Sequence, residues 1–169
     1  AIKKDTESGN TAIDLTGKKV VTLNGGKSTV TGVIASVEAA GKDTSKGAKD
    51  AGLHEEGGHT TRDSKGNVST TAWTSGVKKT GTNNAAIPDF NGVTKPNSKE
   101  LADYWHVHTS GTVKSTDKSG NPIETHAKVG TSPADVKYQK GLQKSGYKAT
   151  AIQVDTYGTD KVNIYNGKG

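Results

Sequence analysis

The sequence predicts a single domain of the α/β class, built from short strands and a small number of helices. Its 169 residues suit one domain. Only 29% of the residues are hydrophobic and 22 are glycines, which indicates a modest core with many turns. Short β-branched segments recur between turn residues, and two segments carry apolar residues at helical spacing. We expect residues 1–169 to form one unit, with flexible segments at 1–10 and 42–50.

The first third of the chain predicts two strands and a helix. Residues 12–15 and 19–23 flank a Gly-containing turn, as the strands of a hairpin do. Residues 29–40 carry valine and isoleucine at helical spacing, with Ser28 as the N-cap and Gly41 as the stop. The polar segment that follows is either a solvated extension of this helix or a linker.

The middle of the chain predicts a hairpin, a long loop and a further strand. Residues 53–73 predict the hairpin, around a turn at 64–67. Residues 74–97 are rich in Gly, Asn and Pro and predict a loop. A loop of this length inside a domain is often functional, and it directly precedes the strand predicted at 104–107. We therefore expect it to line a substrate groove.

The last third predicts a second hairpin, a helix and two strands. The hairpin has arms at 112–116 and 122–127, joined by a polar turn. Residues 133–144 predict the helix, and a Ser-Gly pair ends it. The final strands are expected at 149–154 and 161–165.

Residues with metal-binding side chains lie on both sides of the second hairpin. His106 and His108 are two apart in a predicted strand, so they project from one face. Two neutral imidazoles on one face make half of a zinc site. Ser132 is a good N-cap and Asp135 lies in the first helical turn, so both point to one helix mouth. A hairpin keeps its ends close, which would let the Asp135 carboxylate act as a third ligand and leave the fourth position for water.

This arrangement resembles the JAB/MPN metallopeptidases, or JAMM proteins, whose motif is an upstream Glu, then His-x-His, then Ser-x-x-Asp. The upstream Glu of that motif sits in a Glu-x-x-Gly setting, which Glu55 and Gly58 supply. The chain is most similar to bacterial JAB-like domains at the ends of large exported toxin-type proteins. The resemblance covers residues 53–147, and it departs from the family at 109–131, where a hairpin replaces a shorter loop. The motif segments are His54-Glu55-Glu56-Gly57-Gly58, Trp105-His106-Val107-His108 and Ser132-Pro133-Ala134-Asp135.

The resemblance implies a fold and a mechanism. The fold is a mixed central sheet with flanking helices, of the cytidine-deaminase-like JAB/MPN architecture, with the hairpin inserted as a flap. The implied metal ligands are His106, His108 and Asp135 around Zn²⁺, which lowers the pKa of a bound water to roughly 7. Glu55 would take the proton from that water and pass it to the leaving amine. Ser132 would donate a hydrogen bond to the developing oxyanion.

Each of these residues also has an ordinary structural interpretation. His106 and His108 could be polar residues of a half-exposed strand, and Ser132 with Asp135 could simply cap a helix. Glu55 is chosen over Glu56 because it matches Glu-x-x-Gly. Two histidines and an aspartate do not select zinc over other divalent ions. Three further histidines are expected at the surface and two tryptophans in the core: His54, His59, His126, Trp73 and Trp105.

Composition narrows the function classes. The net charge is +6, but the lysines are scattered and do not interleave with aromatic residues, so we expect a solvated surface and no nucleic-acid partner. No apolar run is long enough to cross a membrane, and the absence of cysteine excludes disulfides and thiolate sites, including those of zinc deaminases.

We expect an exported bacterial hydrolase domain, the C-terminal piece of a longer protein, that acts on a protein or peptide. An immunity protein is a further expected partner of such a toxin domain. The alternative is an inactive JAB-like binding or structural module.

Overall fold

The computed structural model describes most of the chain. The backbone is described for residues 2–4, 11–15, 19–45, 55–74, 89–108, 112–126, 130–156 and 161–165, and side chains for 23–40, 55–74, 89–108, 116–123, 130–156 and 161–165. Most of the predicted loop at 74–97, part of the segment at 42–50 and the side chains of His54 and His126 lie outside these ranges.

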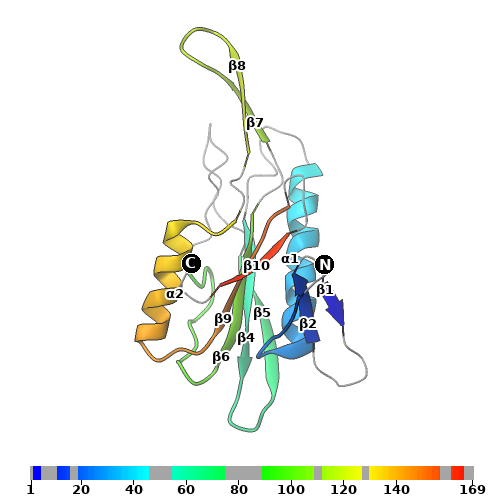
Figure 1. Ribbon diagram of the computed structural model, residues 1–169, viewed down its shortest axis with the longest axis vertical. Coiled ribbons are helices and arrows are strands. Elements are labelled where there is room, and N and C mark those ends of the chain that lie inside the picture. The colour runs from blue at the N-terminus through cyan, green and yellow to red at the C-terminus, as the bar shows by residue number, and fades with distance from the viewer. Residues whose placement is uncertain are drawn as a thin grey trace.

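A five-stranded mixed sheet forms the centre of the molecule (Figure 1). Its strand order is β10-β9-β6-β4-β5. β6 and β9 run parallel, and the other neighbouring pairs are antiparallel. The α/β class predicted from the sequence is therefore correct. The strands are β4 (Glu56–Arg62), β5 (Val68–Ala72), β6 (Leu101–Val107), β9 (Thr150–Val154) and β10 (Val162–Tyr165).

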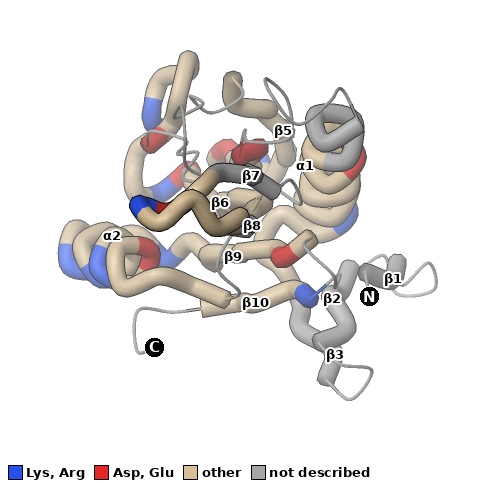
Figure 2. The backbone as a smooth tube through the Cα atoms, turned by 90° about the horizontal axis from the view of Figure 1, so that it is seen from above, with Lys and Arg blue, Asp and Glu red and all other residues tan. Residues whose placement is uncertain are grey.

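Two helices of the described chain cover opposite faces of this sheet, as the view from above shows (Figure 2). α1 (Gly26–Ser45) packs on the face that carries Trp105, and α2 (Pro133–Lys144) lies on the face that carries Tyr104. The alternation of side chains along β6 separates the two cores, because successive residues of a strand point to opposite faces. The core under α1 is formed by Leu23, Val30, Val33, Trp105, Val107, Ile152 and Val154, and the core under α2 by Tyr104, Leu142, Ala149, Ala151 and Tyr165.

The start of α1 differs from the prediction. The helix begins at Gly26, so Ser28 lies inside its first turn, and it continues through Gly41 to Ser45. The carboxylate of Asp103, on β6, accepts hydrogen bonds from the backbone of Gly25 at 2.6 Å and from the Thr29 hydroxyl at 2.6 Å. A residue that is distant in the sequence thus satisfies the helix start, where backbone N–H groups lack helical partners.

The Glu-Glu-Gly-Gly and Trp-His-Val-His segments are neighbours in the sheet. Gly58 on β4 pairs directly with Trp105 on β6. A Cβ on Gly58 would lie 2.6 Å from the Trp105 ring, and one on Gly32 of α1 would lie 2.5 Å from it. The Trp105 indole therefore packs against the backbones of Gly58 and Gly32, and any larger residue at either position would clash with it. Its N–H donates to the Ser36 hydroxyl at 3.0 Å, so Trp105 is a core residue, as predicted.

Two small antiparallel sheets complete the described fold. In the first, β1 (Ile2–Lys4) pairs with β2 (Thr11–Leu15), which pairs with β3 (Lys19–Thr22). A strand therefore forms within residues 1–10, where a flexible segment was expected. The second is the predicted hairpin, β7 (Thr112–Thr116) and β8 (Pro122–His126), which extends beyond the end of the central sheet (Figure 1). None of the described helices has the length and apolar character needed to span a membrane.

Candidate metal centre

Strand register brings the predicted site residues to one edge of the central sheet. Glu56 pairs with Val107 across β4 and β6. Glu55 and His108, one residue further along each strand, are therefore opposite each other, and their side chains point to the face that also carries His106. Glu56 pairs with Val107, so its side chain points to the same face as that of Val107, which is buried in the core under α1. Of the two glutamates, Glu55 is the one on the histidine face.

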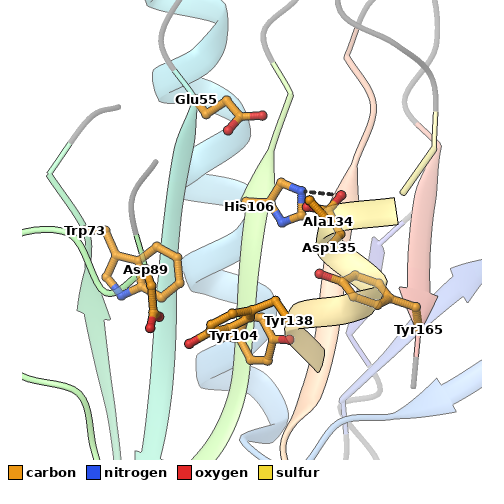
Figure 3. Close-up of a pocket in the computed structure, with 9 residues that line it drawn as sticks. All are labelled: Glu55, Trp73, Asp89, Tyr104, His106, Ala134, Asp135, Tyr138 and Tyr165. Carbon is orange, nitrogen blue, oxygen red and sulfur yellow. Dashed lines mark ion pairs between the residues drawn. The ribbon is translucent and has the colours of Figure 1, made fainter. Parts of the chain in front are cut away.

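Glu55, His106 and His108 could hold a metal ion, because one ligand atom from each lies within 4.8 Å of the others. The His108 Nε2 atom is 3.5 Å from Glu55 Oε1, and the two imidazole rings have centroids 5.1 Å apart. Sequence reasoning proposed Asp135 in place of Glu55 as the carboxylate ligand. The structure places Glu55 beside His108 and Asp135 beside His106, and Figure 3 shows Asp135 next to His106.

Asp135 reaches the site from the first turn of α2. Its Oδ2 atom lies 3.3 Å from His106 Nε2 (Figure 3). The same oxygen accepts a hydrogen bond from the Ser132 backbone N–H at 2.8 Å, while the Ser132 hydroxyl accepts one from the Asp135 N–H at 3.1 Å. This is a capping box, which fixes the carboxylate while it satisfies the helix start. Capping and proximity to the histidines are thus compatible in this chain.

Charges around His106 raise its pKa. Burial lowers the pKa of His106, but the adjacent Asp135 carboxylate, with Glu55 and Asp155, raises it to a net value above the usual one. Burial raises the pKa of Asp135, and His106 outweighs that effect and brings it to about 2. His106 Nε2 is nevertheless buried without a hydrogen bond of regular geometry to any described residue. An imidazole nitrogen in this position can be satisfied by a cation.

A cavity of 270 Å³ opens beside His106 (Figure 3). Its walls are largely aromatic, and its charged lining residues are acidic apart from the histidine. Asp89, from the segment expected to line a groove, is among them. The lining residues are Glu55, Trp73, Asp89, Tyr104, His106, Ala134, Asp135, Tyr138 and Tyr165.

One histidine was assigned to the wrong environment, and one acidic residue of the site was not predicted. His59, expected at the surface, is only 3% exposed, and its Nδ1 accepts a hydrogen bond from Trp73 Nε1 at 2.8 Å. Burial lowers its pKa to about 4. Asp155, which follows β9, lies with its Oδ1 atom 3.7 Å from His108 Nδ1. The sequence gives one weak indication that Asp155 has a role in the site, because this acidic residue directly follows a predicted apolar strand.

Comparisons with known proteins give no relative. No protein-family model matches the sequence, and neither a curated protein nor a solved structure matches this chain.

Proposed function

We propose that this chain is a zinc-dependent peptidase or isopeptidase-like hydrolase of the JAB/MPN type, from an exported bacterial toxin or effector. The observation that carries the proposal is the convergence of three separate segments at His106. Glu55, His106 and His108 form a group that could hold a metal ion, Asp135 lies 3.3 Å from His106, and a cavity opens beside His106. An ordinary surface strand with a capped helix nearby would not require these four side chains to meet.

The donor set fits a zinc ion. Two imidazoles with a carboxylate are typical protein ligands of catalytic zinc, and Asp135 is proposed as that carboxylate. The buried Nε2 atom of His106, which lacks a regular hydrogen bond among the described residues, supports a cation beside this ring. A zinc ion bound here would supply Lewis-acid activation of water and of the scissile carbonyl.

The remaining residues have roles that follow from their positions. Glu55 faces His108 across the strand pair, so its carboxylate can accept the proton of an attacking water and pass it to the leaving amine. The Ser132 hydroxyl accepts from the Asp135 N–H, which leaves its own hydrogen to donate to the developing oxyanion. The cavity beside His106 would receive part of the peptide or protein substrate.

A test should separate metal binding from proton transfer. The zinc-loaded chain is screened against peptide and isopeptide substrates beside Glu55→Gln, which keeps the size of the side chain and removes its basicity. We expect Glu55→Gln to retain zinc and to lose roughly 10²–10⁴-fold in kcat, the usual contribution of a general base. If Glu55→Gln loses zinc, Glu55 is a ligand, and the proposed role as base is wrong.

The same experiment addresses the inactive-module alternative. Turnover that depends on Glu55 supports the enzyme. Zinc binding without turnover of any substrate would favour a binding module. The hairpin, with Ile123 39% exposed, offers such a module an apolar contact.

A further inference from the structure

Asp155 lies beside His108 because of the parallel pairing of β6 and β9. Val107 pairs with Val154, the last residues of the two strands, so His108 and Asp155 follow at the same edge. The His108 backbone N–H donates to the Val154 carbonyl at 2.9 Å, and the Thr156 hydroxyl donates to the His108 carbonyl at 2.6 Å. These bonds hold the backbones of the two segments together.

Hydrogen bonds fix the Asp155 carboxylate in place. The residue is 2% exposed. Its Oδ1 accepts from the Gln153 side chain at 2.7 Å, and its Oδ2 accepts from the Asn163 side chain at 3.1 Å. The Asn163 side chain also donates to Gln153 Oε1 at 2.6 Å, so the two side-chain amides orient each other. A buried carboxylate that accepts several N–H groups is well satisfied as an anion.

This carboxylate lies on the Nδ1 side of the His108 ring. Asp155 Oδ1 lies 3.7 Å from His108 Nδ1, whereas Nε2 of the same ring points toward Glu55. Glu55 is likewise an anion, so the two carboxylates favour opposite positions of the proton on the neutral ring. When Nε2 binds a metal ion, the proton is on Nδ1, where the Asp155 carboxylate stabilises it. Histidine ligands in proteins usually have such a partner on their other nitrogen.

Asp155 also holds the segment that leads into α2. The Gly130 backbone N–H donates to both carboxylate oxygens, at 3.0 and 3.1 Å. Gly130 lies two residues before Ser132, the N-cap of the helix that carries Asp135. His108 directly precedes the inserted segment 109–131, and Gly130 is close to the end of that segment. Asp155 is near both residues.

We propose that Asp155 is a positioning residue of the candidate metal centre. It sets the tautomer of His108 and holds the start of α2 in a fixed position relative to β6. The inference rests on the proposed metal site. It explains how the histidines on the sheet and the carboxylate on the helix stay aligned although a hairpin separates them in the sequence.

The test compares Asp155→Asn with Asp103→Asn. Asp103 is a matched control, because it is also fully buried and accepts backbone and side-chain hydrogen bonds, but at the opposite end of β6. Zinc affinity is measured by competition with a chromogenic chelator at a temperature where both variants are folded. The His108 tautomer is read in the metal-free protein from long-range proton–nitrogen NMR correlations.

We expect Asp155→Asn to weaken zinc binding roughly 10–100-fold, the range found for partners of metal-binding histidines, and to shift His108 away from the Nδ1–H tautomer. Asp103→Asn should lower stability and leave both readouts unchanged. Wild-type affinity and tautomer in Asp155→Asn would overturn the inference while the metal site stands, as would an equal loss of affinity in both variants. Absence of zinc binding in the wild-type chain would overturn the metal site and this inference together.

Discussion

At the scale of single residues, Asp135 serves two purposes with one carboxylate. It completes the capping box of α2 with Ser132, and it lies 3.3 Å from His106 Nε2. The cap requires a hydrogen-bond acceptor, whereas the effect on His106 requires a negative charge. Because these requirements differ, substitutions can separate them.

Asp135→Asn should therefore change His106 more than it changes the helix. The amide oxygen can still accept from the Ser132 N–H, so we expect a loss of less than about 1 kcal/mol in the free energy of unfolding. Asp135 is the largest cause that raises the pKa of His106, so this pKa should fall when the Asp135 charge is removed. An NMR titration of the metal-free protein measures this pKa. Ser132→Ala is the control, expected to cost about 1 kcal/mol of stability and to leave the His106 pKa unchanged.

His59 predicts an acid sensitivity with a defined sign. Burial lowers its pKa from 6.5 to about 4, and Trp73 donates to its Nδ1, so the folded state requires the neutral ring. Its contribution to stability is complete above pH 6.5 and is lost as the pH falls from 6.5 toward 4. At about 1.4 kcal/mol per pKa unit, the loss approaches roughly 3 kcal/mol.

The measurement for His59 is urea unfolding across this pH range. The variant His59→Gln can still accept the Trp73 N–H but does not titrate, so its stability should fall less between pH 6.5 and 4. Parallel stability profiles for the variant and the wild type would show that His59 is not the responsible group.

At the scale of elements, the contact between β4 and β6 depends on glycine. A Cβ on Gly58 would lie 2.6 Å from the Trp105 ring and 2.7 Å from the backbone carbonyl of Thr71. Gly58→Ala should destabilise the fold by about 1–3 kcal/mol, the usual cost of overpacking. Gly141→Ala on α2 is the matched control, because its Cβ would have open space, and it should stabilise the helix by up to about 1 kcal/mol. Urea unfolding of both variants checks this, and equal effects would contradict the packing argument.

Most helices and strands could be predicted from the local sequence. Where the predicted end of an element differs from the structure, contacts with residues distant in the sequence determine that end. The hairpin at β7 and β8, the helix α2 and its capping box follow from turn residues, periodicity and the Ser-Pro start. The start of α1 does not, because Asp103 on β6 caps it. His59 was misjudged for a similar reason, since Trp73, on a neighbouring segment, covers it.

At the scale of the whole molecule, the site depends on how distant strands pair. The sequence indicates that His106 and His108 share a face, and the motif singles out Glu55. It does not indicate that β9 lies parallel to β6, which brings Asp155 to His108. Parallel strands need a long crossover connection, here the segment that contains β7, β8 and α2, so no local pattern reveals their pairing. The residues that contact the candidate ligands could therefore be identified only in the folded chain.

The most direct test of the metal centre is the zinc content of the purified chain after zinc loading and dialysis, beside His106→Ala and Asp135→Ala. Circular dichroism confirms that each variant is folded, and Ser132→Ala controls for loss of the helix cap. We predict close to one zinc per chain in the wild type and in Ser132→Ala, and a large loss in the other two variants. A wild-type chain that takes up no zinc, or variants that retain it fully, would contradict the account.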